Sequence, residues 1–314
     1  MRLLVVGAGS TGGYFGGRIA QAGHDVVFLV RPGRVAQLRR EGLRITSPHG
    51  DATLHPELVT AGAIKAPFDI VLLTVKGFQR AEALEDMAPA VGPETMILPV
   101  LNGMLHMEML AGRFSRHNLV GCALKVATMM EGDGRIVQLT PLQDIAYGEL
   151  DGSTTSRIRA LDAFMKSADI GARLSGSILR EMWEKWVLLA GLGAITCLMR
   201  GTIGEIEACQ GGKAFAEQLL DEVVMIVRAV GEPPSEAFVK SAREQVTAEG
   251  SPLASSMFRD LSRGRPIEVE AIIGDLLRCG QKSKIAAPLL AVAYTHLLVY
   301  QNKVGAGDRS SARH

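Results

Sequence analysis

The sequence predicts an α/β protein in which a doubly wound parallel sheet is followed by an all-helical domain. From residue 2 to residue 100, short apolar runs typical of strands alternate with segments of helical periodicity, as consecutive βαβ units require. Beyond about residue 175 the strand signals end and helical periodicity takes over. A chain of 314 residues normally forms two cores rather than one. We therefore expect an α/β domain over residues 1–175 and a helical domain over residues 176–304.

Four strands of the first domain are expected to be covered by helices on both faces, because they are apolar along their whole length. They span residues 3–6, 26–30, 70–75 and 96–100. Between about residues 118 and 148 the strand-like runs become shorter, and the sequence Glu131-Gly132-Asp133-Gly134 is typical of a hairpin turn. We expect an antiparallel extension of the sheet there.

Helices of the second domain are predicted from their apolar periodicity and from Ser or Pro at several of their starts. They lie near residues 178–198, 213–230, 235–246, 252–261, 266–281 and 288–301. Trp183 and Trp186 are interpreted as packing anchors of the first of these helices. The tail over residues 305–314 lacks apolar residues beyond alanine in its first part and is predicted to be disordered.

Composition argues against several classes of protein. The 34 Lys and Arg residues balance 33 Asp and Glu residues without a block of like charge, so neither a nucleic acid nor an acidic membrane surface is expected as a partner. The four cysteines are too few and too far apart for a disulfide framework or a short metal-ligand pair, and the histidines do not cluster, so we predict no metal. The first apolar run is too short for a signal peptide. These features favour a cytoplasmic protein.

The turn after the first strand carries a glycine pattern that is typical of dinucleotide binding. It reads Gly7-Ala8-Gly9-Ser10-Thr11-Gly12 and leads into a helical run. Gly7 permits a tight turn, Gly9 lets the backbone approach a pyrophosphate, and Gly12 allows the helix to pack closely on the strand. The alternative is a glycine-rich turn without a ligand. Because the pattern lies between a strand and a helix, we predict a Rossmann-like cofactor site.

The residues at the ends of the later strands refine this prediction. Arg31, with Arg34 nearby, follows the second strand where an acid would select NAD, so we favour NADP(H), with Arg31 pairing with the 2′-phosphate. Two solvated arginines are the alternative. Lys76 closes the third strand and Asn102-Gly103 follows the fourth, on the edge where open α/β sheets bind ligands. A solvated lysine and an ordinary turn are the alternatives for these two.

The chain resembles the ketopantoate reductases (2-dehydropantoate 2-reductases) over nearly its whole length. The resemblance is carried, in order, by the glycine turn, Leu29-Val30-Arg31, Thr74-Val75-Lys76, Asn102-Gly103-Met104, Trp183-Glu184-Lys185, Ser255-Ser256-Met257 and Ile267-Glu268-Val269-Glu270. It implies an N-terminal Rossmann domain, a helical C-terminal domain with the active site between them, and NADPH-dependent reduction of 2-dehydropantoate to pantoate in pantothenate biosynthesis.

The resemblance also implies roles for single residues. Lys185 matches the catalytic lysine, and Glu268 and Ser256 match substrate-binding positions, although the register alone does not choose between Ser255 and Ser256. Asn102 and Lys76 match positions near the nicotinamide and the substrate. These residue types suit the chemistry, because an ammonium stabilises the charge that develops on a ketone oxygen and donates the proton.

Three departures from the family concern the substrate. The family usually carries asparagines where this chain has Leu189, Gly193 and Ile273, and the first two lie on the same helix face as Lys185. Each lost hydrogen bond to a buried substrate group costs about 1–3 kcal/mol. We therefore expect reduction of a 2-oxo acid to a 2-hydroxy acid, with a substrate that differs from 2-dehydropantoate. The alternatives are another Rossmann hydroxyacid dehydrogenase and a non-enzymatic NADP(H)-binding sensor or scaffold. The apolar helical domain is compatible with a homodimer.

Overall fold

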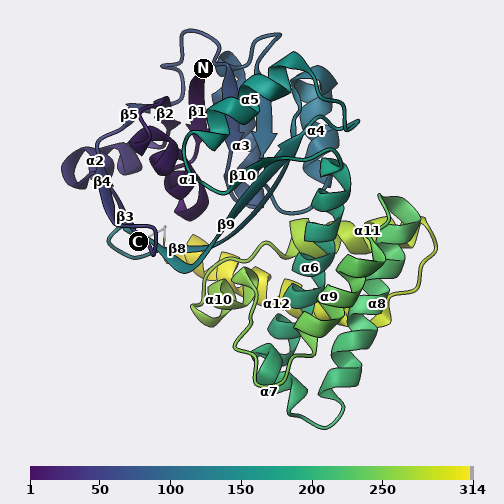
Figure 1. Cartoon of the computed structure of the whole chain (residues 1–314). Helices are drawn as coiled ribbons and strands as arrows, with labels where there is room; N and C mark the ends of the chain where they lie inside the picture. Colours follow the sequence, from purple (N-terminus) through teal and green to yellow (C-terminus); the bar gives the residue numbers. More distant parts are fainter. Residues whose placement is uncertain (312–314) are drawn as a thin grey trace. The chain divides into compact units, whose positions relative to one another are not determined.

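The computed structural model describes residues 1–311 and divides the chain into two compact units (Figure 1). The first unit comprises Met1–Leu101 and His106–Leu179, and the second comprises Asn102–Leu105 and the chain from Arg180 onward. The division therefore lies a few residues after the position expected from the sequence. It also assigns the loop Asn102–Leu105 to the helical unit, which the sequence did not predict.

The first unit contains a parallel five-stranded sheet in the order β5-β2-β1-β6-β7. Its strands are β1 (Arg2–Val6), β2 (Asp25–Leu29), β5 (Glu57–Val59), β6 (Ile70–Leu73) and β7 (Met96–Pro99). Four of them confirm the predicted strands, with ends that differ by one or two residues. β6 and β7 are buried along their whole length, as expected for strands covered on both faces. The predicted doubly wound α/β fold is confirmed.

The helices of this unit follow the strands in alternation. They are α1 (Ser10–Gln21), α2 (Pro32–Glu41), α3 (Arg80–Met87), α4 (Leu105–Arg113) and α5 (Ser156–Lys166), with short 3-10 turns η1 (Gly77–Gln79), η2 (Ala88–Ala90) and η3 (Arg116–Asn118). α1 and α3 each connect a strand to the next part of the parallel sheet, so their N-termini lie at its carboxyl edge.

A second sheet has the order β10-β9-β3-β4, and β8 pairs with β9. Its strands are β3 (Leu43–Thr46), β4 (Ala52–Leu54), β8 (Gly121–Met130), β9 (Ile136–Gly148) and β10 (Ala172–Leu174). The predicted hairpin is present, because Gly134 donates to the Glu131 carbonyl at 3.0 Å and β8 pairs with β9 in antiparallel fashion. The expectation that it extends the first sheet was wrong, since β9 instead pairs with β3 and β10 in a sheet of its own.

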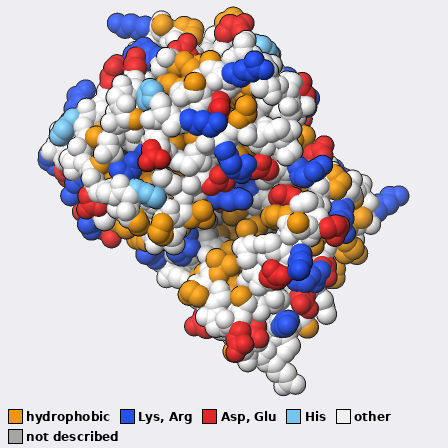
Figure 2. Space-filling model, viewed as in Figure 1, with side chains coloured by type: hydrophobic (Ala, Val, Ile, Leu, Met, Phe, Trp, Pro, Cys, Tyr) orange, Lys and Arg blue, Asp and Glu red, His pale blue; other side chains and the backbone are white. Residues whose placement is uncertain are grey.

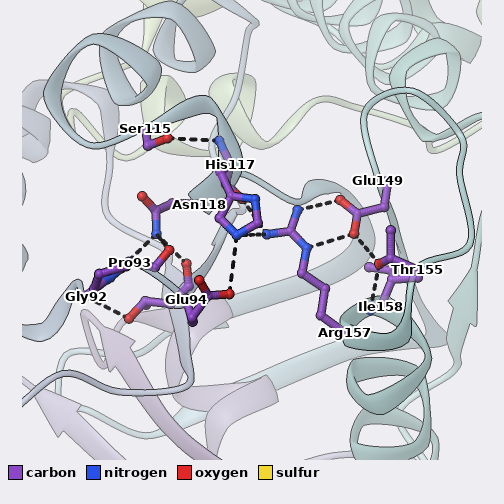
Figure 3. Close-up of polar contacts among 11 residues, drawn as sticks. Gly92, Pro93, Glu94, Ser115, His117, Asn118, Glu149, Thr155, Arg157 and Ile158 are labelled. Carbon is purple, nitrogen blue, oxygen red and sulfur yellow. Dashed lines mark hydrogen bonds and ion pairs between the residues drawn. The ribbon is translucent and has the colours of Figure 1, made fainter.

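A buried ion pair closes one end of this second sheet (Figure 3). Glu149 follows β9, and its side chain is only 7% exposed. Arg157 in α5 donates to its two carboxylate oxygens at 2.8 and 2.5 Å, and Thr155 donates to it at 2.6 Å. Arg157 also donates to the His117 carbonyl, so one guanidinium connects α5, the end of β9 and η3. The hydrogen bonds from Arg157 hold the pKa of Glu149 below its ordinary value.

The described residues of the second unit form helices joined by loops, with no strand among them. It contains α6 (Ile178–Met199), α7 (Ile203–Glu207), α8 (Gly212–Val230), α9 (Glu236–Val246), α10 (Ser256–Ser262), the π-helical turn η4 (Glu270–Gly274), α11 (Asp275–Lys282) and α12 (Pro288–Ser311). The predicted all-helical second domain is thus confirmed. α12 extends through residues 305–311, where the sequence predicted disorder, and residues 312–314 lie outside the described part of the chain.

Helix α6 is the central element of this unit. By length and composition it could cross a membrane, but 61% of its most apolar window is buried inside the structure, as in the core helix of a soluble protein. Trp186 donates from its indole nitrogen to the Ile272 carbonyl at 2.8 Å, and a Cβ atom at Gly231 would lie 2.4 Å from the Trp183 ring. Both tryptophans therefore act as packing anchors, as predicted.

Candidate functional site

The glycine turn between β1 and α1 has the geometry that a phosphate-binding turn requires. Gly7 has a φ of +97°, a conformation that side chains strongly disfavour. A Cβ atom at Gly12 would lie 2.2 Å from the Gly7 carbonyl oxygen and 2.1 Å from Thr74 Oγ1, so only glycine fits there. Gly9, in contrast, has nothing within 4 Å of its Cβ position, and no side chain caps the helix that it precedes. The first N–H groups of α1 therefore face open space that suits an anion.

Thr74, just beyond the end of β6, holds this turn in place. Its hydroxyl lies 2.9 Å from the Val6 carbonyl and 3.0 Å from the Gly7 carbonyl, so it links the ends of two neighbouring strands beneath the glycine turn. The sequence predicted that Thr74 lies near the end of a strand over residues 70–75 but indicated no role for its side chain. The sequence signal for this role is the threonine itself, which follows β6, the strand that neighbours β1.

The two arginines near the end of β2 have different surroundings. Arg31 is the N-terminal capping residue of α2, its side chain is 58% exposed, and it forms an ion pair with Glu82 in the first turn of α3. Arg34 is half-buried and donates to Gln37 and to the Gly134 carbonyl, and burial lowers its pKa. Of the pair, Arg31 is the more exposed, and Arg34 already donates to groups of the protein.

The remaining predicted cofactor residues lie on the same edge of the first sheet. Ala8 precedes the N-terminus of α1, and Ser10 and Thr11 form its first turn. Lys76 is half-buried and caps the turn η1, directly after the loop that leaves β6. The glycine turn, Arg31 and Lys76 therefore all lie at the carboxyl edge of the parallel sheet in the first unit.

The loop after β7 brings two predicted substrate residues together within the second unit. Asn102 Nδ2 donates to Glu268 Oε2 at 3.2 Å. The loop is fixed at its neighbour Gly103, which has a φ of +82° and whose Cβ atom would lie 2.4 Å from the Ala271 carbonyl oxygen. This close approach places Asn102 beside the π-helical turn that follows Glu268.

The structure distinguishes the two serines that the sequence left open. Ser255 is 4% exposed, accepts the Phe258 N–H at 2.9 Å as the cap of α10, and lies 3.0 Å from the Thr196 hydroxyl. Its hydroxyl is therefore occupied in capping the helix. Ser256 is the first residue of α10 and is exposed. Ser256 is thus the serine available to a ligand.

Lys185 lies on α6 and is half-buried. The two residues that precede it have structural roles. Trp183 packs on Gly231, and Glu184 accepts both the backbone N–H and the hydroxyl of Ser235 at 2.9 Å, which anchors the start of α9. The role of Glu184 was not foreseen, because a serine that starts a distant helix gives no signal near position 184.

The three departures from the family share an apolar environment. Leu189 is half-buried, Gly193 is buried, and Ile273 is fully buried in the π-helical turn. A Cβ atom at Gly193 would lie 3.0 Å from Met257 Cε and 3.9 Å from Ile272 Cγ2. The methionine of Ser255-Ser256-Met257 thus occupies the space beside Gly193, where an asparagine side chain would need to fit.

Charge and metal chemistry add no further site. Acidic and basic side chains are interspersed over the face shown in Figure 2, as the near-neutral composition indicated. Across residues 1–311, no group of three or more His, Cys, Asp or Glu side chains is arranged to hold a metal ion.

A parallel sheet with a glycine turn at its carboxyl edge, followed by a helical unit, places the chain among two-unit α/β proteins with a Rossmann-like first unit. Comparison with known proteins makes this specific. The family model for ketopantoate reductase PanE/ApbA matches residues 3–152, and the model for its C-terminal part matches residues 177–301. The chain belongs to the ketopantoate reductase family.

Individual relatives agree with this assignment. The chain is 33% identical to the uncharacterized oxidoreductase YkpB of Bacillus subtilis, over 96% of this chain and 99% of the relative. It is 29% identical to the 2-dehydropantoate 2-reductase of Halobacterium salinarum, over 92% and 95%. The crystal structure of 2-dehydropantoate 2-reductase from Geobacter metallireducens superposes with a TM-score of 0.85 at 28% identity, over 96% of this chain and 99% of that one. The protein is therefore an oxidoreductase of this family.

A further neighbour shares the fold alone. The ternary structure of D-mandelate dehydrogenase with NADH and anilino(oxo)acetate has a TM-score of 0.86 at 18% identity, over 97% of this chain and the whole of that one. In that structure the dehydrogenase holds NADH.

Proposed function

We propose that the protein is an NADPH-dependent reductase that converts a 2-oxo acid into a 2-hydroxy acid. The observation that carries this proposal is the hydrogen bond between Asn102 and Glu268, because it brings an amide and a carboxylate together on the unit that also carries Lys185. An amide, a carboxylate and an ammonium supplied by one unit form the polar set that a hydroxylated or carboxylated ketone needs.

The cofactor is assigned to residues of the first unit. The open space at Gly9 and the uncapped N-terminus of α1 fit a pyrophosphate, which Gly7, Ala8, Gly9, Ser10, Thr11 and Gly12 would surround. Arg31 would bind the 2′-phosphate and Lys76, with Asn102, would lie near the nicotinamide. When bound, the nicotinamide supplies a hydride to the carbonyl carbon.

The chain's own residues handle the charge that follows. We assign Lys185 as the catalytic residue, whose ammonium stabilises the developing charge on the carbonyl oxygen and delivers the proton to it. Glu268 would accept a hydrogen bond from a substrate hydroxyl or orient the lysine, and it is itself held by Asn102. Ser256 would add a hydroxyl contact from the start of α10.

The substrate is proposed to carry an apolar side chain. Leu189, Gly193 and Ile273 supply no hydrogen bonds, and Met257 fills the space beside Gly193. The D-mandelate dehydrogenase structure holds anilino(oxo)acetate, an aromatic oxo acid, on the same fold. The curated 2-dehydropantoate 2-reductases among the relatives favour 2-dehydropantoate itself, and thus a place in pantothenate biosynthesis, as the second candidate.

A steady-state assay with NADPH tests these assignments. The panel contains 2-dehydropantoate and 2-oxo acids with branched and aromatic apolar side chains, and we expect a higher kcat/KM for the apolar acids. Lys185→Ala is expected to lower kcat at least a hundredfold while NADPH affinity stays within twofold. Lys213→Ala, which changes an exposed lysine on α8, is the control. NADPH binding without turnover of any acid would favour the sensor or scaffold function instead.

The setting of the enzyme is proposed as well. The burial of most of the apolar window of α6 and the near-equal numbers of acidic and basic residues support a cytoplasmic enzyme that acts on a small molecule, without nucleic acid or membrane partners. The helical unit is the proposed surface of a homodimer. Light scattering over a concentration series tests the dimer, and a monomer throughout would contradict it.

A further inference from the structure

The ion pair between Arg31 and Glu82 joins two strand ends that flank the glycine turn. β1 lies between β2 and β6 in the parallel sheet. Arg31 follows β2, whereas Glu82 lies in the first turn of α3, which follows β6. Both side chains remain more than half exposed, at 58% and 59%. The pair therefore lies at the carboxyl edge of the sheet, where the ribose of a dinucleotide is bound in this fold.

The fold thus brings an acid, Glu82, next to the end of β2, where the sequence itself has no acid. In NAD-selective sites an acid at the end of β2 accepts a hydrogen bond from the ribose 2′-hydroxyl and repels a 2′-phosphate. Here the end of β2 carries Arg31, but Glu82 reaches it from the other side of β1. Sequence reasoning that inspects only the end of β2 finds the arginine and misses the carboxylate.

We propose that Glu82 is a specificity-determining residue for the cofactor, which competes with the 2′-phosphate of NADPH for Arg31 and so weakens the preference for NADPH over NADH. The inference rests on the proposed function, because it requires a nicotinamide nucleotide at this edge. A 2′-phosphate must take the guanidinium away from Glu82 and tolerate a nearby carboxylate, whereas a 2′-hydroxyl is neutral and can donate to that carboxylate.

The expected size of the effect follows from the exposure of the pair. Exposed ion pairs change an equilibrium by about two- to fivefold, and salt screens them. Glu82→Gln should therefore tighten NADPH binding about two- to fivefold at low ionic strength, and leave NADH binding unchanged or weaker. The gain should shrink in 0.5 M NaCl.

Glu85→Gln provides the matched control. Glu85 lies on the same helix, is also exposed, and pairs with Arg113 at 3.0 Å instead of Arg31. Glu85→Gln removes the same charge from α3 but leaves the Arg31–Glu82 pair in place, so its effect on NADPH binding should stay below 1.5-fold. Glu82→Gln is also measured in an Arg31→Met background, where we expect it to change NADPH affinity by less than 1.5-fold, because the shared partner is gone.

The experiment measures dissociation constants of NADPH and NADH by nucleotide fluorescence and calorimetry, without turnover. An increase in the ratio of NADH to NADPH dissociation constants for Glu82→Gln alone supports the proposal. The proposal is overturned if the ratio changes equally in Glu85→Gln, if NADH tightens as much as NADPH, or if the effect persists without Arg31. If the wild-type chain binds neither nucleotide, the proposed function and this inference are both overturned. If the wild-type chain binds both nucleotides and Glu82→Gln leaves both dissociation constants unchanged, only this inference is overturned.

Discussion

Gly9→Ala is expected to weaken cofactor binding at least tenfold while leaving the fold intact. The φ of Gly9 is −82°, which alanine adopts freely, and nothing lies within 4 Å of the added methyl group. Alanine is a poorer helix cap than glycine by only about 0.5 kcal/mol. The methyl group would enter the space above the N-terminus of α1 and displace a pyrophosphate from one or two N–H groups. At about 1.5–3 kcal/mol for each charged hydrogen bond, NADPH affinity should fall at least tenfold.

Substitutions of two other glycines serve as controls for the effect on stability. Gly12→Ala places its methyl group 2.2 Å from a backbone carbonyl oxygen and 2.1 Å from the Thr74 hydroxyl, so it should lower the free energy of unfolding by about 3 kcal/mol. Gly33→Ala adds a methyl group to the first turn of α2 with nothing within 4 Å, and should raise the free energy of unfolding by about 0.5 kcal/mol.

Urea unfolding and NADPH fluorescence titration on the three variants separate the two effects. Binding of NADPH by Gly9→Ala within twofold of the wild type would refute the assignment of the pyrophosphate to this turn. A loss of stability in Gly9→Ala as large as that in Gly12→Ala would refute the claim that the space at Gly9 is open.

Two further predictions concern buried carboxylates. Because the folded pKa of Glu149 is lowered, its pairing should stabilise the fold above the unfolded pKa of about 4.3 and lose this effect as pH falls through the folded pKa. Arg157→Met should leave Glu149 buried and unpaired and cost about 3 kcal/mol at pH 7, and less at pH 5, in urea unfolding; an equal cost at both values would contradict the role of the charge. Glu222 accepts the Leu289 and Leu290 N–H groups at 3.1 and 2.9 Å, so Glu222→Gln should lower stability by about 1–2 kcal/mol with NADPH affinity unchanged, and an unchanged melting curve would refute this capping role.

The sequence predicted the features that depend on local pattern. The four buried strands show as continuous apolar runs, and the glycine turn is recognisable because Gly7 and Gly12 are fixed by contacts made within the first βα unit and with the adjacent strand. The helical second unit followed from periodicity alone. The strand β5 was missed, since three residues with an exposed Glu57 at the edge give too short an apolar signal.

The features that escaped prediction depend on long-range pairing. Asn102 and Glu268 are 166 residues apart, and Arg31 and Glu82 are 51 apart, so neither hydrogen bond leaves a local trace in the sequence. The second sheet was misplaced for the same reason. The β8–β9 hairpin has a local turn signal in the sequence. The strand β3 that pairs with β9 lies about ninety residues earlier, at the register of Ile45 with Ile136, so the sequence near the hairpin does not indicate which sheet the hairpin joins.

The assignment of Asn102–Leu105 to the helical unit has a consequence for how specificity is distributed. The residues proposed to select the nucleotide, Arg31 and Glu82, lie in the first unit, whereas Asn102, Lys185 and Glu268 lie in the second. Gly103 packs on Ala271 and Asn102 bonds to Glu268, so contacts within the second unit hold Asn102 beside Glu268. The Arg31–Glu82 pair and Gly193 share no contact, so the free-energy effects of Glu82→Gln and of Gly193→Ala on kcat/KM with NADPH should add in the double variant. A double variant that departs from the sum by more than about 0.5 kcal/mol would contradict this independence.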